Sequence, residues 1–228
     1  MPAVDSTDTV QPGSAATTKT VVHLLRHGEV DNPRGILYGR LPGFQLSALG
    51  RQMAQGVADE LVGRLHLDIR YLAASSLIRA QQTAAPLATG SGQPIVTDDR
   101  LIEAANAFEG IKFRASMLRR PQHWAKLRNP TRPSWGEPYL EIARRMSGAL
   151  YAAEQSARGG VAVLVSHQLP IWTLRRHLQG QRLWHNPARR QCNLASLTTV
   201  HFANGVITSV RYSEPVAQLA ATGSGVGA

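Results

Sequence analysis

The chain contains 228 residues, of which 43% are hydrophobic, and this is sufficient for one domain with a sizeable buried core. Its formal net charge of +10 would attract anions, but the basic residues occur singly or in pairs rather than in a long block, so we expect no nucleic-acid partner. The single cysteine, Cys192, excludes an intramolecular disulfide. No apolar run approaches the roughly 20 residues that span a bilayer, so we expect no membrane partner.

Residues 1–18 are predicted to be a disordered leader, because they consist mainly of small and polar side chains that cannot form a core. They lack the basic start and the apolar run of a signal peptide, which together with the single cysteine favours a cytoplasmic location. We expect residues 19–213 to form a single domain and residues 214–228 to form a flexible tail.

The first half of the domain alternates strand and helix patterns. Apolar and β-branched residues predict a strand over 20–26, and repeated Gly and Pro residues predict a loop over 28–46. Ser47 is a suitable N-cap for a helix that extends to about Gly63. The next elements are expected to be a strand at 69–75, a helix at 77–89 that stops at Gly90, and a short strand at 95–97.

The second half begins with a weaker pattern, since residues 104–136 carry several Arg, Trp and Pro residues and are expected to form a cap or lid. A helix is predicted from Pro138 to about Ala157. The continuous apolar run at 160–167 is typical of a central strand that is covered on both faces. The remaining elements are expected to be a helix at 170–178 and a hairpin of strands 194–202 and 206–212, joined through an Asn-Gly turn.

Strands that alternate with helices indicate the α/β class with a mainly parallel sheet. In such sheets, ligands bind outside the carboxyl ends of the strands. The residues that directly follow each strand are therefore the first candidates for a functional site.

Two of the stronger predicted strands end at a histidine. The first ends at Arg26-His27-Gly28, the later apolar strand ends at Ser166-His167, and the helix after the second strand carries Arg79 in its first turn. Two guanidinium groups bind phosphate oxygens and stay charged at any working pH. A neutral imidazole can attack phosphorus directly, and Gly28 allows the backbone to approach an anion closely.

Each of these residues has an ordinary structural explanation when it is taken alone. A histidine at a strand end is commonly a partly buried polar residue, and an arginine in the first turn of a helix is commonly a surface charge. The three segments together are a stronger signal than any one of them, because each follows a predicted strand of the same sheet.

The stretches "LLRHGEV", "LSALGRQMA", "SSLIRAQQTA", "LIEAANAFEG" and "VLVSHQLPIWTLRRHL" resemble the histidine phosphatase superfamily, which is also called phosphoglycerate mutase-like. They occur in the family's order and cover most of residues 20 to about 180. The resemblance implies a three-layer α/β/α fold with a mainly parallel, mixed central sheet. It also implies that His27 is the nucleophile, that Arg26, Arg79 and His167 form the phosphate pocket, and that Glu103 is the proton donor.

The implied role of Glu103 has a chemical reason. An alkoxide is a poor leaving group, so a protonated carboxyl must supply a proton as the P–O bond breaks. We expect no metal and no cofactor, because the two arginines and two histidines supply the positive field and the sequence contains no His-Glu-x-x-His motif or Cys/His cluster.

The loop after the first strand departs from the family pattern. Val30 stands where Thr is common, and position 33 is Pro where the family has Asn. Asn32, one residue earlier, is therefore our candidate for the phosphate contact. Tyr38 and Arg40 are expected near the pocket mouth, with packing of the loop as their alternative role. Gln168, directly after His167, is included among the substrate-binding residues.

The sequence favours a phosphatase that acts on a small phosphorylated metabolite. The alternative within the family is phosphoglycerate mutase-type phosphoryl transfer, but Glu103 is followed by Ala-Ala-Asn rather than by the motif of the glycolytic mutases. A non-catalytic phosphate-binding or nucleic-acid-binding protein is a further alternative. The identity of the substrate and the oligomeric state stay open.

Overall fold

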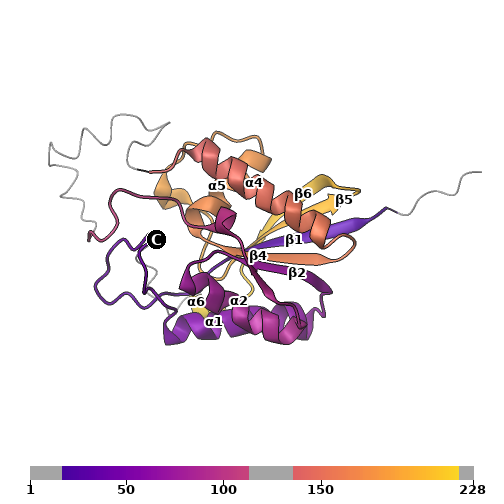
Figure 1. The fold of residues 1–228 in the computed structure, drawn as a ribbon, viewed down its shortest axis with the longest axis horizontal. Coiled ribbons are helices and arrows are strands. Elements are labelled where there is room, and N and C mark those ends of the chain that lie inside the picture. Colours follow the sequence, from indigo (N-terminus) through magenta and orange to yellow (C-terminus); the bar gives the residue numbers. More distant parts are fainter. Residues whose placement is uncertain (1–16, 113–135, 221–228) are drawn as a thin grey trace, which may run out of the picture.

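The computed structural model describes residues 17–112 and 136–220, and within them a six-stranded sheet lies between two layers of helices (Figure 1). The strands are β1 (Lys19–Arg26), β2 (Ile69–Ala74), β3 (Ile95–Thr97), β4 (Val161–Ser166), β5 (Leu197–Ala203) and β6 (Val206–Ser213). The α-helices are α1 (Ala48–Ala58), α2 (Ile78–Ser91), α4 (Tyr139–Ser156), α5 (Gln168–Leu178) and α6 (Ala217–Ala220). A π-helical segment (Asp59–Arg64) and two 3-10 turns, Asp99–Leu101 and Pro187–Arg189, complete the elements.

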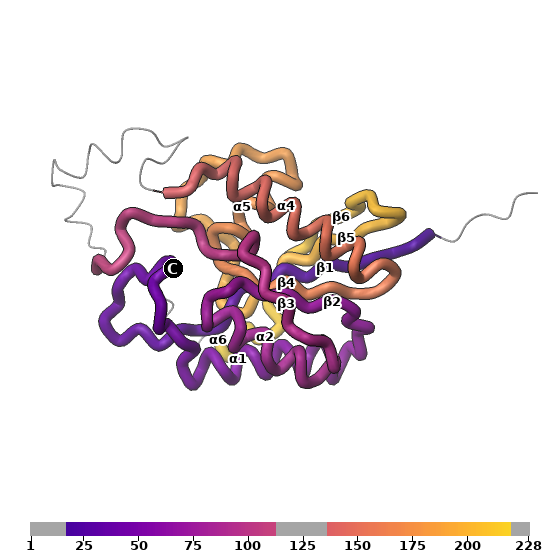
Figure 2. The backbone as a smooth tube through the Cα atoms, viewed as in Figure 1, coloured from indigo at the N-terminus to yellow at the C-terminus, as the bar shows by residue number. Residues whose placement is uncertain are grey.

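The sheet has the strand order β3-β2-β4-β1-β5-β6. The strands β3, β2, β4 and β1 run parallel to one another, whereas β5 pairs antiparallel with β1 and with β6. The predicted mixed, mainly parallel α/β sheet is therefore confirmed. The carboxyl ends of β1, β2 and β4 lie at the same edge, where the loop after β1 and the segment after β3 also gather (Figure 2).

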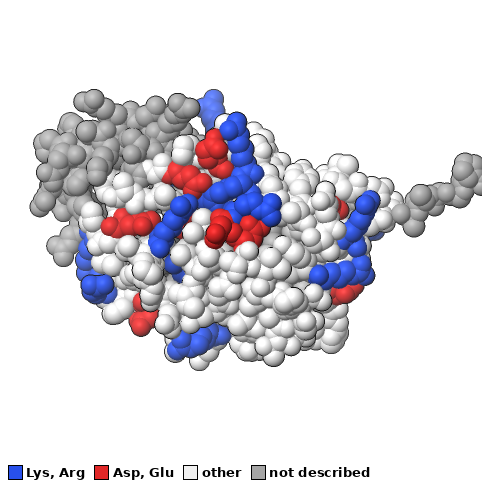
Figure 3. All heavy atoms as spheres, in the orientation of Figure 1, with Lys and Arg blue, Asp and Glu red and all other residues white. Residues whose placement is uncertain are grey.

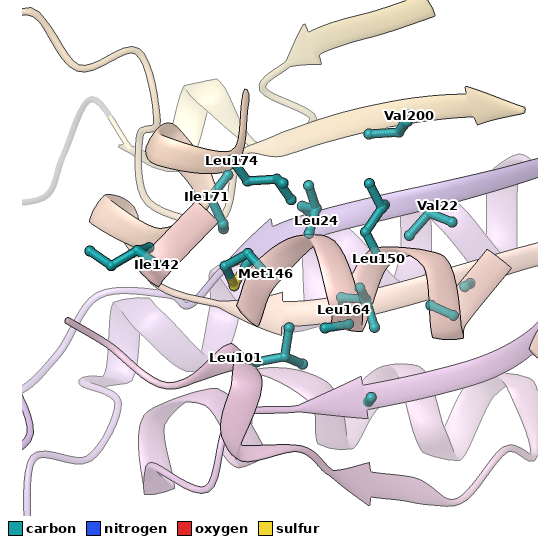
Figure 4. Close-up of a cluster of buried hydrophobic side chains, with 14 of the residues drawn as sticks. Val22, Leu24, Leu101, Ile142, Met146, Leu150, Leu164, Ile171, Leu174 and Val200 are labelled. Carbon is teal, nitrogen blue, oxygen red and sulfur yellow. The ribbon is translucent and has the colours of Figure 1, made fainter. Parts of the chain in front are cut away.

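The two faces of the sheet are buried against separate hydrophobic clusters. Every residue of β4 is buried, and its side chains alternate between the cluster under α4 and α5 and the cluster under α1 and α2. Figure 4 shows the first cluster, in which Met146 and Leu150 of α4 lie over Leu24 of β1 and Leu164 of β4. The apolar run at 160–167 therefore has the two-sided burial that its composition predicts.

Two helix boundaries differ from the sequence expectation. The expected stop at Gly90 is wrong, because α2 continues to Ser91 and ends at Gly92, which adopts the left-handed conformation (φ 72°) that glycine favours at this position. The helix α5 begins at Gln168, two residues before the expected start at Pro170. A proline fits there because the first-turn N–H groups of a helix have no intrahelical acceptor.

The expected hairpin turn is confirmed, since Asn204 (φ 51°) and Gly205 (φ 77°) join β5 to β6. The segment 214–220, which we expected to be flexible, instead contains α6. Val216 is buried, and its side chain lies against Gly56 of α1. The apolar Val216 and Leu219 pack against the second cluster, a contact that the Ala- and Gly-rich composition conceals.

Three expectations fall largely or wholly outside the described residues: the leader 1–18, the cap 104–136 and the end of the tail. Of the cap, residues 104–112 and Gly136 are described, with a bridge between Asn106 and Gly136. Within the described parts of the chain, no helix has both the length and the apolar character required to cross a membrane.

The loop after β1 rests directly on the start of α1. A methyl group at Gly50 would lie 2.0 Å from the carbonyl oxygen of Glu29, and one at Gly28 would lie 2.5 Å from the carbonyl oxygen of Gly50. Both distances are far below van der Waals contact, so the two backbones approach only because neither glycine has a side chain.

We expect Gly50→Ala to lower the free energy of unfolding by about 1 to 3 kcal/mol, because the added methyl group must displace the Glu29 backbone. Urea denaturation measures the change. The matched control is Gly63→Ala, where a methyl group would meet nothing within 4 Å. Equal stability of Gly50→Ala and the wild type would show that this backbone contact does not constrain the fold.

A buried histidine on β1 makes the stability depend on pH. The imidazole Nδ1 of His23 lies 2.9 Å from Oγ1 of Thr199. Burial, and to a lesser extent His201, lowers the pKa of His23 from 6.5 to about 4. Between these two pH values, the unfolded chain therefore binds a proton that the folded chain does not bind.

The stabilisation from neutral His23 is complete above pH 6.5 and is lost as the pH falls toward 4. We expect His23→Gln to reduce the difference in unfolding free energy between pH 7.5 and pH 4.5 by about 2 to 3 kcal/mol. Chemical denaturation at both pH values measures this difference. The control is His177→Gln, which removes an exposed imidazole; an equal effect in both variants would exclude His23 as the source.

Candidate active site

The two arginines and two histidines that the sequence singles out meet at one site. Arg26 ends β1 and is paired in register with Ser166 at the end of the neighbouring β4. His27 and His167 follow these two residues, and their ring centroids lie 5.1 Å apart. Arg79, in the first turn of α2, reaches the same site, and its charge lowers the pKa of both histidines.

The cluster is buried although all four side chains are polar. His27 and His167 are fully inaccessible, and Arg79 and Arg26 are 1% and 6% exposed. Each arginine is anchored by a backbone carbonyl: Arg26 Nη1 donates to Cys192 (2.7 Å), and Arg79 Nη2 donates to Gly39 (2.6 Å). These anchors fix two guanidinium groups that would otherwise favour water.

Four atoms of the cluster have no hydrogen-bond partner in the described part of the chain: Arg26 Nε, His27 Nε2, Arg79 Nε and His167 Nδ1. Buried polar atoms are normally paired, so four such atoms in one cluster indicate a polar ligand. Guanidinium groups that face neutral imidazoles suit an anion, and a tetrahedral oxyanion can accept from several donors at once. The chemistry of the cluster therefore fits a phosphoryl group.

Both histidines are neutral at physiological pH. Burial lowers the pKa of His27 well below 6.5, and the charges of Arg79 and Arg26 lower it further. The same causes, burial first and then Arg79, lower the pKa of His167. Because His27 Nδ1 lies 2.7 Å from the carbonyl oxygen of Gly28, we assign the ring proton to Nδ1. This assignment leaves the lone pair on Nε2, the ring atom that has no partner.

Glu103 lies beside the cluster on the segment that follows β3. Its carboxylate accepts the N–H of Ala104 at 2.8 Å, and its residue is 9% exposed. Burial raises the pKa of Glu103, while the N–H of Ala104 and the charges of Arg79, Arg190 and Arg26 have smaller, opposite effects. A buried carboxyl with a raised pKa can hold a proton for transfer.

The segment that carries Glu103 is held by a network of two arginines and one glutamate. Arg40 Nε donates to the carbonyl oxygen of Glu103 (2.6 Å), and Arg40 Nη2 is paired with Glu137 (3.0 Å). Arg145 pairs with the other oxygen of Glu137 (2.7 Å) and donates to the carbonyl oxygens of Arg100 and Ile102. Basic and acidic side chains lie interleaved on the face shown in Figure 3, as ion pairs of this kind require.

The expected substrate-binding residues differ in whether they contact the cluster. Tyr38 is buried at the cluster, 6.5 Å from the ring of His27 and with the guanidinium of Arg79 4.8 Å from its ring centroid. Gln168 borders the site, with its Nε2 3.4 Å from the carbonyl oxygen of Cys192. Arg40 contacts the backbone of Glu103, so its described contacts hold the Glu103 segment and do not reach the cluster.

The side-chain amide of Asn32 is bound by the backbone of its own loop. Its Nδ2 donates to the carbonyl oxygen of Ile36 (2.9 Å), and its Oδ1 accepts the N–H of the same residue (3.2 Å). Both ends of the amide therefore close a turn of the loop. An asparagine side chain readily forms such local backbone contacts, and they compete with binding at a distance.

Several residues that contact the site are not among the candidates from the sequence. Ser75 binds His167 Nε2 (2.8 Å), and Thr83 Oγ1 accepts the N–H of Gly28 (3.1 Å); both lie in the stretch "SSLIRAQQTA", where they could have been found. Arg190 and the carbonyl of Cys192 come from the irregular segment between α5 and β5, and no pattern in the sequence points to them. Among the described residues, no group of three or more His, Cys, Asp or Glu side chains is placed to hold a metal ion.

Comparison with known proteins agrees with this geometry. A protein from Mycobacterium tuberculosis described as uncharacterized protein Rv0525 is 52% identical over 201 residues, which cover 87% of this chain and 98% of that protein. A probable phosphoglycerate mutase GpmB from Escherichia fergusonii is 30% identical over 72% of this chain and 76% of its own length. The solved structure of mycobacterial glucosyl-3-phosphoglycerate phosphatase Rv2419c is 27% identical, with a TM-score of 0.66, and the match covers 86% of this chain and 96% of that one.

The family model of the histidine phosphatase superfamily (branch 1) matches residues 22–215. This range includes most of β1, all of β2 to β6, the clustered histidines and arginines, and Glu103. The chain therefore belongs to the histidine phosphatase superfamily.

Proposed function

We propose that the protein is a phosphomonoester hydrolase that acts on a small phosphorylated molecule through a phosphohistidine at His27. The observation that carries this proposal is the state of His27 Nε2: it belongs to a neutral imidazole, has no partner among the described residues and lies in a cluster with Arg26, Arg79 and His167. The family contains both phosphatases and mutases, so hydrolysis is the step that the proposal adds.

In the first step, the lone pair of His27 Nε2 forms a bond to phosphorus while the P–O bond to the alcohol breaks. Glu103 donates its proton to the departing oxygen, so that the alcohol leaves neutral and the carboxylate stays behind. Arg26 and Arg79 stabilise the charge on the phosphoryl oxygens, and His167 Nδ1 faces the same group. Donation from this nitrogen requires a proton there, with the other ring nitrogen accepting from Ser75.

In the second step, water attacks phosphorus and the P–N bond breaks. The carboxylate of Glu103 accepts the proton from the water, which restores both the acid and the neutral imidazole and releases inorganic phosphate. His27 keeps its orientation throughout, because Nδ1 stays bonded to the carbonyl oxygen of Gly28.

The related structures support a phosphatase. The Rv2419c structures are of a mycobacterial glucosyl-3-phosphoglycerate phosphatase, and they include complexes with VO3 and with inorganic phosphate. A second candidate is phosphoglycerate mutase activity, which the name of the GpmB relatives favours. Release of free phosphate from phosphomonoesters, measured beside the interconversion of 3- and 2-phosphoglycerate, distinguishes the two activities.

Substitution of the proposed nucleophile tests the mechanism. We expect His27→Ala to lower kcat for p-nitrophenyl phosphate by about 10³-fold or more, because the variant lacks the imidazole on which the proposed covalent intermediate forms. Acid-labile radioactive label should be trapped on the wild type after quenching during turnover of a ³²P-labelled substrate, and it should be absent from the variant. The control is His177→Ala, at an exposed position outside the cluster. Full turnover by His27→Ala would overturn the mechanism.

Substitution of Glu103 tests the proton donor. We expect Glu103→Gln to lower kcat/KM by about 10²- to 10⁴-fold for an alkyl phosphate and much less for p-nitrophenyl phosphate, whose leaving group needs no proton. Because the protonated carboxyl is the active form and its pKa is raised, the wild-type rate for alkyl phosphates should fall as the pH rises through that pKa. This alkaline limb should be absent from the variant. An equal loss for both substrates would contradict a role in proton donation.

A further inference from the structure

The described site contains a third arginine that the proposed mechanism does not use. Arg190 follows the 3-10 turn Pro187–Arg189, and its side chain is directed by two neutral acceptors. Its Nε donates to Nε2 of His185 (2.9 Å), and its Nη1 donates to Oε1 of Gln168 (3.4 Å). These contacts use two of the five N–H donors of a guanidinium, so donors remain for a ligand.

The orientation of Arg190 is fixed in advance. His185 is buried, its Nδ1 lies 2.7 Å from the carbonyl oxygen of Leu183, and its ring packs against Tyr139 and Trp172. Burial lowers the pKa of His185, so its ring is neutral and Nε2 is free to accept from Arg190. A guanidinium held in this way loses little conformational freedom when it binds an anion.

The charge of Arg190 is not balanced by an ion pair in the described part of the chain. Arg40 and Arg145 each form an ion pair with Glu137, whereas Arg190 forms none within residues 17–112 and 136–220. A partly buried guanidinium without a carboxylate is costly, because neutral acceptors replace only part of its hydration. A ligand with a negative group would offset that cost.

The position of Arg190 shows which part of a substrate it would meet. Gln168 links it to the carbonyl oxygen of Cys192, which also accepts from Arg26, so Arg190 borders the phosphate cluster. Its charge acts on Glu103. In the proposed mechanism Glu103 protonates the departing oxygen, so the alcohol part of the substrate lies on this side of the site.

The charges of the site can be counted. Arg26, Arg79 and Arg190 supply three positive charges, and a phosphomonoester dianion offsets two of them. Glu103 must be protonated to act as the acid, so it does not offset the third. We propose that Arg190 is a specificity-determining residue that binds a second anionic group, a carboxylate or a second phosphate, on the alcohol part of the substrate. This inference rests on the proposed function, because the hydrolytic mechanism defines the leaving-group side.

The test uses two ligands that differ at one group: 3-phosphoglycerate carries a carboxylate where glycerol 3-phosphate carries a neutral CH₂OH. Each is measured as a competitive ligand against p-nitrophenyl phosphate and by calorimetric binding to His27→Asn, which cannot form the phosphoenzyme. We expect the wild type to bind 3-phosphoglycerate more tightly. Arg190→Gln should weaken that binding by about 10- to 100-fold and should change glycerol 3-phosphate binding by less than about threefold.

Two further variants keep the test decisive. Arg189→Gln removes the same charge from the adjacent, exposed residue and should preserve the discrimination. Arg190→Lys retains the charge and should keep part of the preference, even if Arg190→Gln folds poorly. The inference is overturned if the wild type does not discriminate between the ligands, if Arg190→Gln weakens both equally, or if Arg189→Gln has the same effect.

The outcomes also separate this inference from the proposed function. Hydrolysis of p-nitrophenyl phosphate that depends on His27, without discrimination by Arg190, would leave the phosphatase proposal standing and remove the inference. Discrimination in the calorimetric experiment without any phosphate release would remove the phosphatase proposal and retain the anion-binding role of Arg190.

Discussion

The site depends on one constraint, the parallel pairing of β1 with β4 at the centre of the sheet. This pairing sets Arg26 beside Ser166 and brings the two following histidines to a ring separation of 5.1 Å. Both strands are buried on both faces by apolar residues, so the hydrophobic energy of the core stabilises the position of a cluster that is itself costly to bury. The backbone carbonyls of Gly39 and Cys192 reduce this cost for the arginines. The Nε atoms of Arg26 and Arg79 still have no partner among the described residues.

The close approach of Gly28 and Gly50 fixes the position of the loop after β1, as the strand pairing fixes the residues before it. The start of α1 contacts the backbone that follows His27 so tightly that neither position has room for a methyl group. His27 is therefore fixed on both sides, by the strand before it and by the helix beneath its loop. The carbonyl oxygen of Gly28 is fixed with them, and it is the group that selects the tautomer of the imidazole.

The part of the site that follows strand periodicity could be predicted from the sequence, and the part that depends on irregular segments could not. His27 and His167 directly follow buried strands, and Arg79 lies in the first turn of the helix after β2, so the alternation of strands and helices is sufficient to bring them together. Glu103 was identified only through the family resemblance, because its segment has no regular pattern. The place of Asn32 in the motif predicts a phosphate contact, whereas in the structure its amide binds the backbone of its own loop. Arg190 could not be predicted, because its position depends on tertiary contacts with His185 and Gln168.

The balance of charge around Glu103 connects these features to the proposed reaction. Burial raises the pKa of this carboxyl, whereas Arg79, Arg190 and Arg26 oppose the shift. In the proposed mechanism, a bound phosphate dianion offsets two of these cations and a second anionic group offsets Arg190, so the opposing effect is weakened when the substrate is in place. The effect of burial then dominates, and Glu103 holds its proton most firmly in the complex where that proton is required. A single buried carboxyl among three arginines would thus become an acid through the binding of its substrate.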